Sequence, residues 1–416
     1  MSRIIFHIDV NSAYLSWTAV EQKKAGEKRD IRTIPAIIGG DRRSRHGIVL
    51  AKSIPAKQYG IRTGEPVANA LRKCPELWIE PPDHQLYRTY SRRLMDFLRA
   101  YTPDIEQVSV DECYMDYSGI VHQFGEPAAA AEKIKDSIRE AFGFTVNIGI
   151  SSNKLLAKMA SDFEKPDRIH TLFPGEIRDK MWPLPVRRLY MAGGSSEATL
   201  KKLGIRTIGD LAGTDPDILE LHLKSHGKML WNFANGIDDS PVITWKTEAK
   251  GVGNSITLAE DVTDKEQALR VLHTLAESVG SRLRKAGQKA GSVNVEIKYA
   301  TFESCSHQKQ LLTETSGDGV LYRAASELFQ ELWDGRPIRL LGIRTSKLVS
   351  QDAPRQMSLF EWMENEQREK IPAAAEKQTM DGRQAEKQEK LSRALDEIRK
   401  KYGEDAVKRG CCKKQE

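Results

Sequence analysis

FHIDVNSAYLSW (residues 6–17) and SVDECYMD (residues 109–116) are the two stretches that decide the fold. The first carries an apolar run that ends on Asp9, and the second places Asp111 and Glu112 at or near a tight turn between two expected strands. Apolar runs bounded by turn residues are typical of buried strands. Three acids on neighbouring strands would hold two divalent cations, as phosphoryl transfer requires. An isolated Asp-Glu pair is more commonly a solvated turn, so the surrounding pattern has to decide.

Around these acids, residues 1–165 alternate strand and helix, which predicts an α+β domain. The strand expected over Phe144 to Ile150 alternates apolar side chains on one face. Helices are expected over Gln85 to Ala100, Ala128 to Ala141 and Asn153 to Phe163.

Three further regions differ in pattern. Residues 36–80 mix glycine, proline and basic residues and predict a small subdomain of short strands and turns. Residues 175–236 are expected to be all-helical with short loops. Residues 246–350 combine a long helix with alternating strands, with these bounds: helix Glu266 to Ala286, strands Ser292 to Tyr299 and Ile338 to Leu348.

The chain has 416 residues, enough for two to four domains. Hydrophobic residues make up 39% and the net charge is +6, which fits a globular protein with a nucleic-acid partner without requiring one. The N-terminus has no long apolar segment of the signal-peptide type, and no run approaches the ~20 apolar residues of a membrane span. The five scattered cysteines show no zinc spacing, so we expect free thiols and a cytoplasmic location.

Beyond residue 350 the composition turns polar and charged, with a short apolar island at 356–360. Leu391, Leu395, Ile398 and Tyr402 recur at helical spacing. The tail is therefore either an amphipathic helix or a segment that is disordered until bound.

Four segments stand in order along the chain: FHIDVNSAYLSW, SVDECYMD, NIGISSNKLLAKMASDFEKPD (147–167) and LKKLGI (200–205). Together they resemble the Y-family, or translesion, DNA polymerases of the DNA polymerase IV and UmuC type, over about residues 1–360. The D-V-N triplet looks more like the UmuC branch, and the sequence leaves the two branches open. The resemblance implies an α+β, multidomain right-hand polymerase with palm, small fingers, helical thumb and an α+β little finger.

That resemblance divides the chain as follows: palm 1–15 and 81–172, fingers 16–80, thumb 173–240, linker 241–247, little finger 248–350, and polar tail 351–416. The resemblance implies small fingers and an open active site, and therefore low-fidelity synthesis, because discrimination then rests mainly on base pairing. The expected partners are primer-template DNA and deoxynucleotide substrates, and the expected state is a monomer.

The resemblance also implies residue roles. Asp9, Asp111 and Glu112 would be catalytic and would ligate two Mg²⁺ ions, with the Val10 backbone carbonyl as a further ligand. Tyr14 would be the steric gate, whose ring clashes with a 2′-hydroxyl. Nucleotide contacts would come from Lys165 and Lys57.

The chain departs from the family pattern in two places. In the fingers, Ile54 and Lys57 stand where many relatives carry Tyr and Arg. Ile54 cannot donate a hydrogen bond to the triphosphate, and Lys57 keeps the positive charge but cannot make the bidentate contact of an arginine. Lys52 is a candidate to compensate. In the thumb hairpin, Met191 stands where a glycine is expected, which leaves Gly193 and Gly194 as the candidates to grip a DNA phosphate.

Two further contact sites are implied. In the little finger, Arg339, Arg344 and Lys347 would lie along the DNA backbone. The apolar island resembles the peptide that binds the bacterial sliding clamp; its residues are Gln356, Met357, Ser358, Leu359 and Phe360.

Two alternatives remain beside an active translesion polymerase. One is a catalytically impaired DNA-binding accessory or regulatory protein on the same scaffold, which the departures at Ile54 and Met191 motivate. The other is a palm-type nucleotidyltransferase such as a cyclase, which would need no thumb, little finger or clamp peptide and fits poorly.

Overall fold

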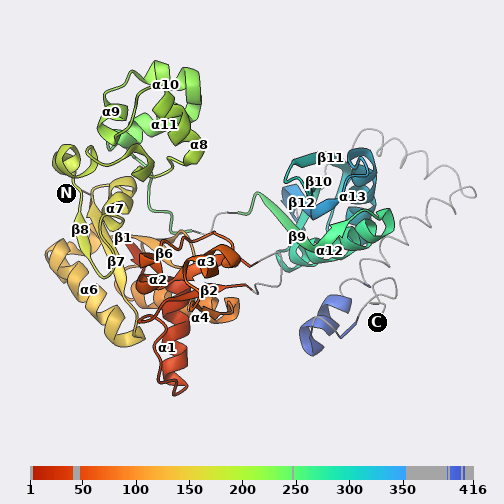
Figure 1. Cartoon of the computed structure of the whole chain (residues 1–416), viewed down its shortest axis with the longest axis horizontal. Helices are drawn as coiled ribbons and strands as arrows, with labels where there is room; N and C mark the ends of the chain where they lie inside the picture. Colours follow the sequence, from red (N-terminus) through yellow and green to blue (C-terminus); the bar gives the residue numbers. More distant parts are fainter. Residues whose placement is uncertain are drawn as a thin grey trace, which may run out of the picture. The chain divides into compact units, whose positions relative to one another are not determined.

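The computed structural model describes residues 3–40, 47–245, 248–352, 391, 394–403 and 406–407. These residues fall into two compact units, a first unit of Met1–Lys246 and a second unit of Thr247–Glu416 (Figure 1). The expected α+β architecture is confirmed, because both units combine β-sheets with packed helices.

A five-stranded sheet in the order β5-β6-β1-β7-β8 forms the centre of the first unit. Its central strand pairs antiparallel with both neighbours, β6 and β7. Side chains alternate across β1, so that Phe6 and Ile8 enter the main core while His7 and Asp9 face the other way. The strands are β1 (Ile5–Val10), β5 (Ile105–Gln107), β6 (Glu112–Asp116), β7 (Val146–Ser151) and β8 (Ile169–Thr171).

Helices cover both faces of this sheet. Residues of α1, α4 and α6 share the main core with the apolar side chains of β1 and β7, whereas α7 packs on the opposite face. There Gly149 permits a close approach, because a Cβ atom at this position would lie 1.9 Å from the Ala157 carbonyl oxygen. The helices are α1 (Ala13–Lys24), α4 (His84–Arg99), α5 (Val121–Phe124), α6 (Pro127–Phe142), α7 (Lys154–Ser161) and the one-turn η1 (Ser118–Ile120).

A three-stranded sheet in the order β3-β2-β4 forms the small region within residues 36–80. It includes two short helices as well as the expected strands and turns. Ser53 begins the first helix, because its hydroxyl accepts a hydrogen bond from Ala56 N. The elements are β2 (Ala36–Gly39), β3 (Val49–Lys52), α2 (Ile54–Gln58), α3 (Val67–Lys73) and β4 (Trp78–Glu80).

Residues 174–234 are helical, as their sequence predicts, around a core that includes Leu200, Ile208 and Leu230. Gly204, which has a φ of 83°, lies in the turn between two of these helices. The elements are η2 (Pro174–Glu176), η3 (Ile177–Met181), η4 (Val186–Arg188), α8 (Gly194–Lys202), α9 (Ile208–Ala212), α10 (Pro216–Leu223) and α11 (Ser225–Ala234).

The second unit is an antiparallel sheet in the order β11-β10-β12-β9, with two helices packed on one face. Val293, Val295 and Ile297 alternate into that core, which leaves the side chains between them on the open face. The elements are β9 (Gly251–Val262), α12 (Lys265–Lys285), β10 (Gln288–Tyr299), β11 (Ser304–Thr315), α13 (Asp318–Leu332) and β12 (Ile338–Ser350).

Part of the tail is helical: residues 394–402 form a helix that contacts α12 within the second unit. Asp396 lies 2.7 Å from Arg284 of α12, and Arg399 lies 3.2 Å from Glu277 of the same helix. Leu391, Ile398 and Tyr402 are exposed on the tail. The structure therefore shows a helix over residues 394–402, and the contacts it makes with α12 are ion pairs.

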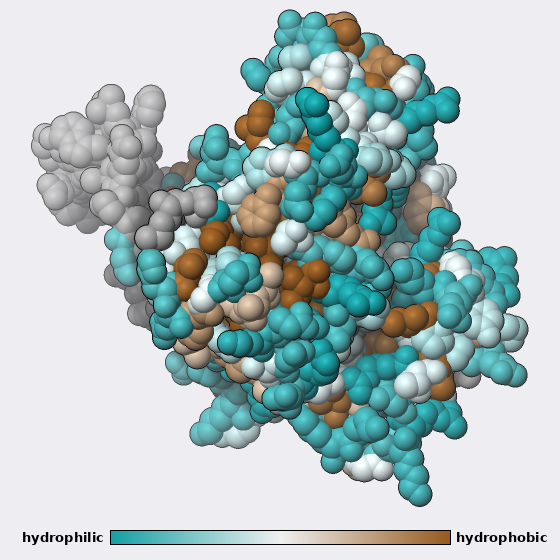
Figure 2. Space-filling model, turned by 90° about the vertical axis from the view of Figure 1, so that its left-hand side faces the viewer, coloured by the Kyte–Doolittle hydropathy of each residue, from teal (hydrophilic) through white to brown (hydrophobic). Residues whose placement is uncertain are grey.

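Among the described residues, no helix has the length and apolar character needed to cross a membrane. The face drawn in Figure 2 is predominantly hydrophilic, with apolar side chains in small groups.

Candidate active site

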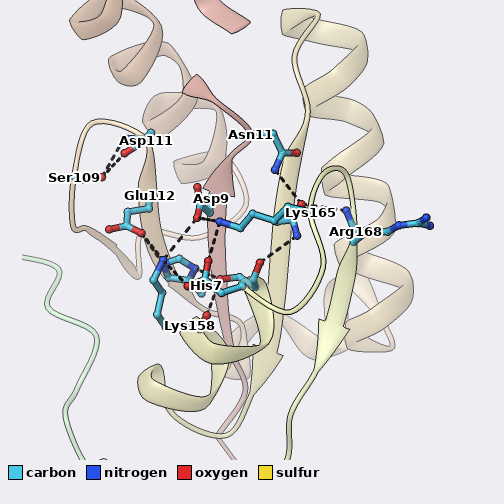
Figure 3. A network of polar contacts seen from close by, with 12 residues as sticks. His7, Asp9, Asn11, Ser109, Asp111, Glu112, Lys158, Lys165 and Arg168 are labelled. Atoms are coloured by element: carbon cyan, nitrogen blue, oxygen red, sulfur yellow. Dashed lines mark hydrogen bonds and ion pairs between the residues drawn. The ribbon is translucent and has the colours of Figure 1, made fainter. Parts of the chain in front are cut away.

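Strand pairing brings the three acids together at one end of the central sheet. Asp9 of β1 lies directly opposite Glu112 of β6 in the antiparallel register. Val10 N donates a hydrogen bond to the Asp111 carbonyl oxygen at 3.0 Å, which fixes the turn before β6 against β1. Asp9, Asp111 and Glu112 therefore converge, as Figure 3 shows.

Two lysines neutralise this group of carboxylates. Lys158 of α7 lies 2.8 Å from Glu112 Oε2 and 3.7 Å from Asp9 Oδ2. Lys165, in the loop after α7, lies 2.5 Å from Asp9 Oδ2 and 2.8 Å from Asp162 Oδ1. Burial opposes the charge of both ammonium groups, but the nearby carboxylates outweigh burial and raise the pKa of each lysine.

His7 supports Glu112 from within the sheet. The imidazole is buried, and burial lowers its pKa, so the neutral ring is favoured. Its Nδ1 lies 2.8 Å from Ser161 Oγ, while Nε2 lies 3.3 Å from Glu112 Oε2 without the alignment of a regular hydrogen bond. The contact with His7, together with Lys158, lowers the pKa of Glu112 to about 2, against its partial burial.

Asp111 has the opposite electrostatic environment. Burial raises its pKa, and the negative charges of Asp9 and Glu112 raise it further, although Ser109 donates a 2.6 Å hydrogen bond that favours the charged form. A carboxylate that is held among like charges with no cation of its own gains from a nearby cation. Asp111 is therefore the acid whose charge has the least compensation from the protein among these three.

These side chains fit a divalent cation through their chemistry, since all three offer hard carboxylate oxygens in a partly exposed setting. Within the described part of the chain, no group of three or more His, Cys, Asp or Glu side chains has the arrangement of a ready metal site. The carboxylate oxygens instead contact Lys158, Lys165, His7 and Ser109. Binding of a cation at this point therefore requires the lysine contacts to rearrange.

A pocket of about 400 Å³ opens beside the acids. Tyr14 lies on its wall and stacks on Tyr87, with ring centroids 4.3 Å apart and an interplanar angle of 10°. The stacking holds the Tyr14 ring in one orientation. Val10, Asp9 and Asp111 line the same pocket, so the expected gate and three of the expected ligands share one cavity.

Three lysines also line this pocket: Lys52, Lys57 and Lys165. Burial lowers the pKa of Lys52, and the charge of Lys57 lowers it further, so these two cations repel each other across the cavity wall. Ile54 lies there too and is 53% exposed. Cations gathered in one pocket favour an anionic ligand such as a phosphate chain.

Met191, in the turn before α8, has the left-handed backbone conformation that glycine favours. Met191 has a φ of 70°, which side chains other than glycine adopt at a cost of about 1–2 kcal/mol. Gly193 directly precedes α8, and Gly194 is its first residue, so their N–H groups lie at a helix N-terminus.

The three basic residues expected to contact DNA in the second unit have different surroundings. Arg344 is exposed, between Asn294 and Gly253 in the strand register. The Arg339 guanidinium lies 4.6 Å from the ring centroid of Phe302, and Lys347 donates to Gln310 Oε1 at 2.9 Å. The island of residues 356–360 lies outside the described residues.

Sequence reasoning quoted the motif that contains Lys158 but did not assign the residue, and it also missed His7 and Asn147. A signal for Lys158 was present: Asn153 caps α7, and the buried positions Leu155, Leu156 and Met159 set the phase of the helix. No comparable signal marks His7 or Asn147, because strand alternation alone does not say what packs on each face.

Comparison with known proteins agrees with this geometry. The model of the impB/mucB/samB family matches residues 8–162, and that of the impB/mucB/samB family C-terminal domain matches residues 249–359. DNA polymerase IV of Clostridium acetobutylicum is 46% identical over 98% of this chain and 98% of its own length. DNA polymerase IV 1 of Bacillus subtilis is 35% identical over 100% of this chain and 94% of its own.

Among solved structures, a Y-family DNA polymerase chimera of Dbh and Dpo4 shares the fold, with a TM-score of 0.73 and 23% identity over 83% of this chain and 99% of that one. The two relatives carry the DNA polymerase IV name, so they do not support the lean of the D-V-N triplet towards UmuC. The chain therefore belongs to the impB/mucB/samB family, the Y-family polymerases that its motifs resemble.

Proposed function

We propose that this chain is a template-directed DNA polymerase of the translesion type, which adds deoxynucleotides to a primer 3′ end. Family membership implies primer-template DNA as partner and catalysis with a divalent metal. The observation that carries the proposal is the convergence of Asp9, Asp111 and Glu112 at the edge of a pocket that Asp9, Asp111, Tyr14 and Lys165 line.

In this proposal the metal is Mg²⁺, with two ions held by Asp9, Asp111, Glu112 and the Val10 carbonyl. When bound, the ions would lower the pKa of the attacking hydroxyl and neutralise the leaving pyrophosphate. Tyr14, stacked on Tyr87, blocks the space of a ribose 2′-hydroxyl. Lys165, Lys57 and Lys52 bind the triphosphate by charge, which offsets the missing donor at Ile54.

In this proposal the protein contacts mainly the sugar-phosphate backbone of the DNA. The open face of the second unit's sheet has a hollow of about 780 Å³, lined mainly by small and polar side chains, with one acid, Glu296, and one cation, Arg344. Such a face fits a sugar-phosphate backbone and carries no base code. Gly193 and Gly194 add N–H donors from the thumb, and Arg339 and Lys347 lie on the same domain as Arg344.

The domain division, the monomeric state and the clamp peptide are part of the same proposal. Gln356 to Phe360 combines a polar anchor with Leu and Phe, which suits an apolar pocket on a sliding clamp. A cytoplasmic location follows from the chromosomal template that a polymerase uses.

Primer extension over undamaged and damaged templates, with Mg²⁺ and the four deoxynucleotides, tests the proposal. The unmodified chain should extend both, and Asp9→Ala should extend neither while it still binds primer-template DNA. A chain that binds DNA and incorporates no nucleotide with any divalent metal would instead be the accessory protein considered above. A Phe360→Ala variant should lose only the stimulation by a sliding clamp.

A further inference from the structure

Two buried amides join the central sheet to the loop that carries Lys165. Asn11 follows β1, and Asn147 lies on β7; both are buried, Asn147 completely. Asn11 Nδ2 donates to Asn147 Oδ1 at 3.0 Å. Figure 3 labels Asn11 near Lys165. Buried amides of this kind are stable only when their donors and acceptors find partners.

Asn147 holds the loop on both sides of Lys165. Its Nδ2 donates to the carbonyl oxygens of Ser161 at 3.1 Å and Glu164 at 2.7 Å, and its Oδ1 accepts from Arg168 N at 3.3 Å. Two carbonyl acceptors fix which end of the amide is nitrogen, so its orientation is determined by the network.

Asn11 binds the backbone of Asp167, in the loop after Lys165. Its Oδ1 accepts from Asp167 N at 2.9 Å and from the Thr145 hydroxyl at 2.9 Å. Asp167 has a φ of 60°, a left-handed conformation that needs support from its surroundings. The Asp167 carboxylate is held separately, 3.1 Å from Arg139.

Lys165 therefore projects from a loop whose backbone is tied at Glu164, Asp167 and Arg168. The ammonium reaches Asp9 and the pocket. Among the described residues, no backbone hydrogen bond joins Lys165 itself to the sheet. Asn147 does not line the pocket, so it has no direct route to a bound nucleotide.

We propose that Asn147 is a positioning residue for nucleotide binding, which acts through Lys165 by fixing the 162–168 loop. Asn11 completes the same hydrogen-bond network, but it also lines the pocket. The inference rests on the proposed role of Lys165 as a triphosphate ligand. A lysine spends less conformational entropy on a ligand when its backbone is already fixed, so the network strengthens the binding of the nucleoside triphosphate.

A double-mutant cycle on the full chain tests this. Asn147→Ala and Lys165→Ala should each raise the KM for a deoxynucleotide about tenfold, and the double variant should be no worse than Lys165→Ala alone. The kcat of Asn147→Ala should change much less than its KM. Ser151→Ala is the matched control, since it removes a buried hydrogen bond from the same strand to Leu172, outside the loop.

Hydrogen exchange gives a readout independent of activity. Asn147→Ala should speed the exchange of the Arg168 and Asp167 amides, and Ser151→Ala should not. If Asn147→Ala does not fold, Asn11→Ala replaces it in the exchange experiment alone, with the Asp167 amide as its readout, because Asn11 lines the pocket and could affect KM directly. Unchanged exchange of that amide would overturn the positioning role.

The outcomes separate the two claims. Independent, multiplicative effects of Asn147→Ala and Lys165→Ala on KM would overturn the positioning role while leaving Lys165 as a ligand. An unchanged KM in Lys165→Ala would overturn both the ligand assignment and the positioning role. Unchanged exchange at Asp167 and Arg168 in Asn147→Ala would also overturn the positioning role.

Discussion

The ammonium of Lys158 lies 2.8 Å from a carboxylate oxygen of Glu112, across the face of the sheet that carries the candidate metal ligands. The same ammonium lies 3.7 Å from Asp9 and 3.4 Å from Asp162. Lys158 thus offsets the repulsion among Asp9, Glu112 and Asp162. It does so from α7, the helix that Gly149 allows to approach the strands closely.

Lys158→Met should destabilise the protein by about 2 kcal/mol without divalent metal, because partly buried carboxylates lose their cation. Added Mg²⁺ should recover part of that loss, since it supplies positive charge to the same acids. Thermal unfolding with and without Mg²⁺ measures both effects.

Lys154→Met is the control for this prediction. Lys154 lies on the same helix, is similarly buried and pairs with Glu106 at 2.7 Å, away from the three acids. Its destabilisation should not depend on Mg²⁺. Equal Mg²⁺ dependence in both variants would contradict a metal site beside Lys158.

Tyr14→Ala should let ribonucleotides enter, because it removes the stacked ring that we propose as the barrier to a 2′-hydroxyl. Selection for deoxynucleotides, measured as a ratio of kcat/KM values, should fall at least about tenfold. Tyr14→Phe keeps the ring and should keep the selection. An unchanged ratio of kcat/KM values for deoxynucleotides and ribonucleotides in Tyr14→Ala would show that Tyr14 is not the steric gate.

The strand pattern was enough to predict much of this site. Asp9, Asp111 and Glu112 end or begin apolar runs, and antiparallel pairing of such strands brings their ends together. The stretches around them also carry the family motifs, so the fold class and the acids were both predictable.

The polar partners of those acids were not predictable from strands alone. His7 and Asn147 look like ordinary core positions in the sequence. Only tertiary packing places His7 beside Glu112 and Asn147 beside the loop that carries Lys165. The small region within 36–80 was predicted as strands and turns, but Ser53 caps a helix there, which sets Lys57 on the pocket wall. Short helices of this kind depend on caps and tertiary contacts more than on periodicity.

Lys52→Ala and Lys57→Ala should each raise the KM for deoxynucleotides several-fold, about 3–10-fold, with little change in DNA affinity. The physical reason is the loss of one cation from a pocket that concentrates positive charge. Arg72→Ala, on α3 and away from the pocket lining, is the charge-matched control. Steady-state kinetics with a single nucleotide separate the three variants.

Arg344→Ala should weaken binding to primer-template DNA to a similar degree for all sequences, because the proposed contact is to phosphate. The slope of log affinity against log salt concentration should fall by about 1. Arg270→Ala, on helix α12 that packs on the other face of the same sheet, should change neither. Sequence-dependent loss in Arg344→Ala would contradict a backbone contact.

The central claim is that Asp111 belongs to a metal-dependent nucleotidyl-transfer site, and primer extension by Asp111→Ala under Mg²⁺ titration tests it most directly. Asp96→Ala, an exposed acid on α4, serves as the control, and DNA affinity is measured for each variant. The account predicts that Asp111→Ala loses at least about a hundredfold in kcat at saturating Mg²⁺ while it still binds primer-template DNA. Extension by Asp111→Ala at the rate of the unmodified chain would contradict it.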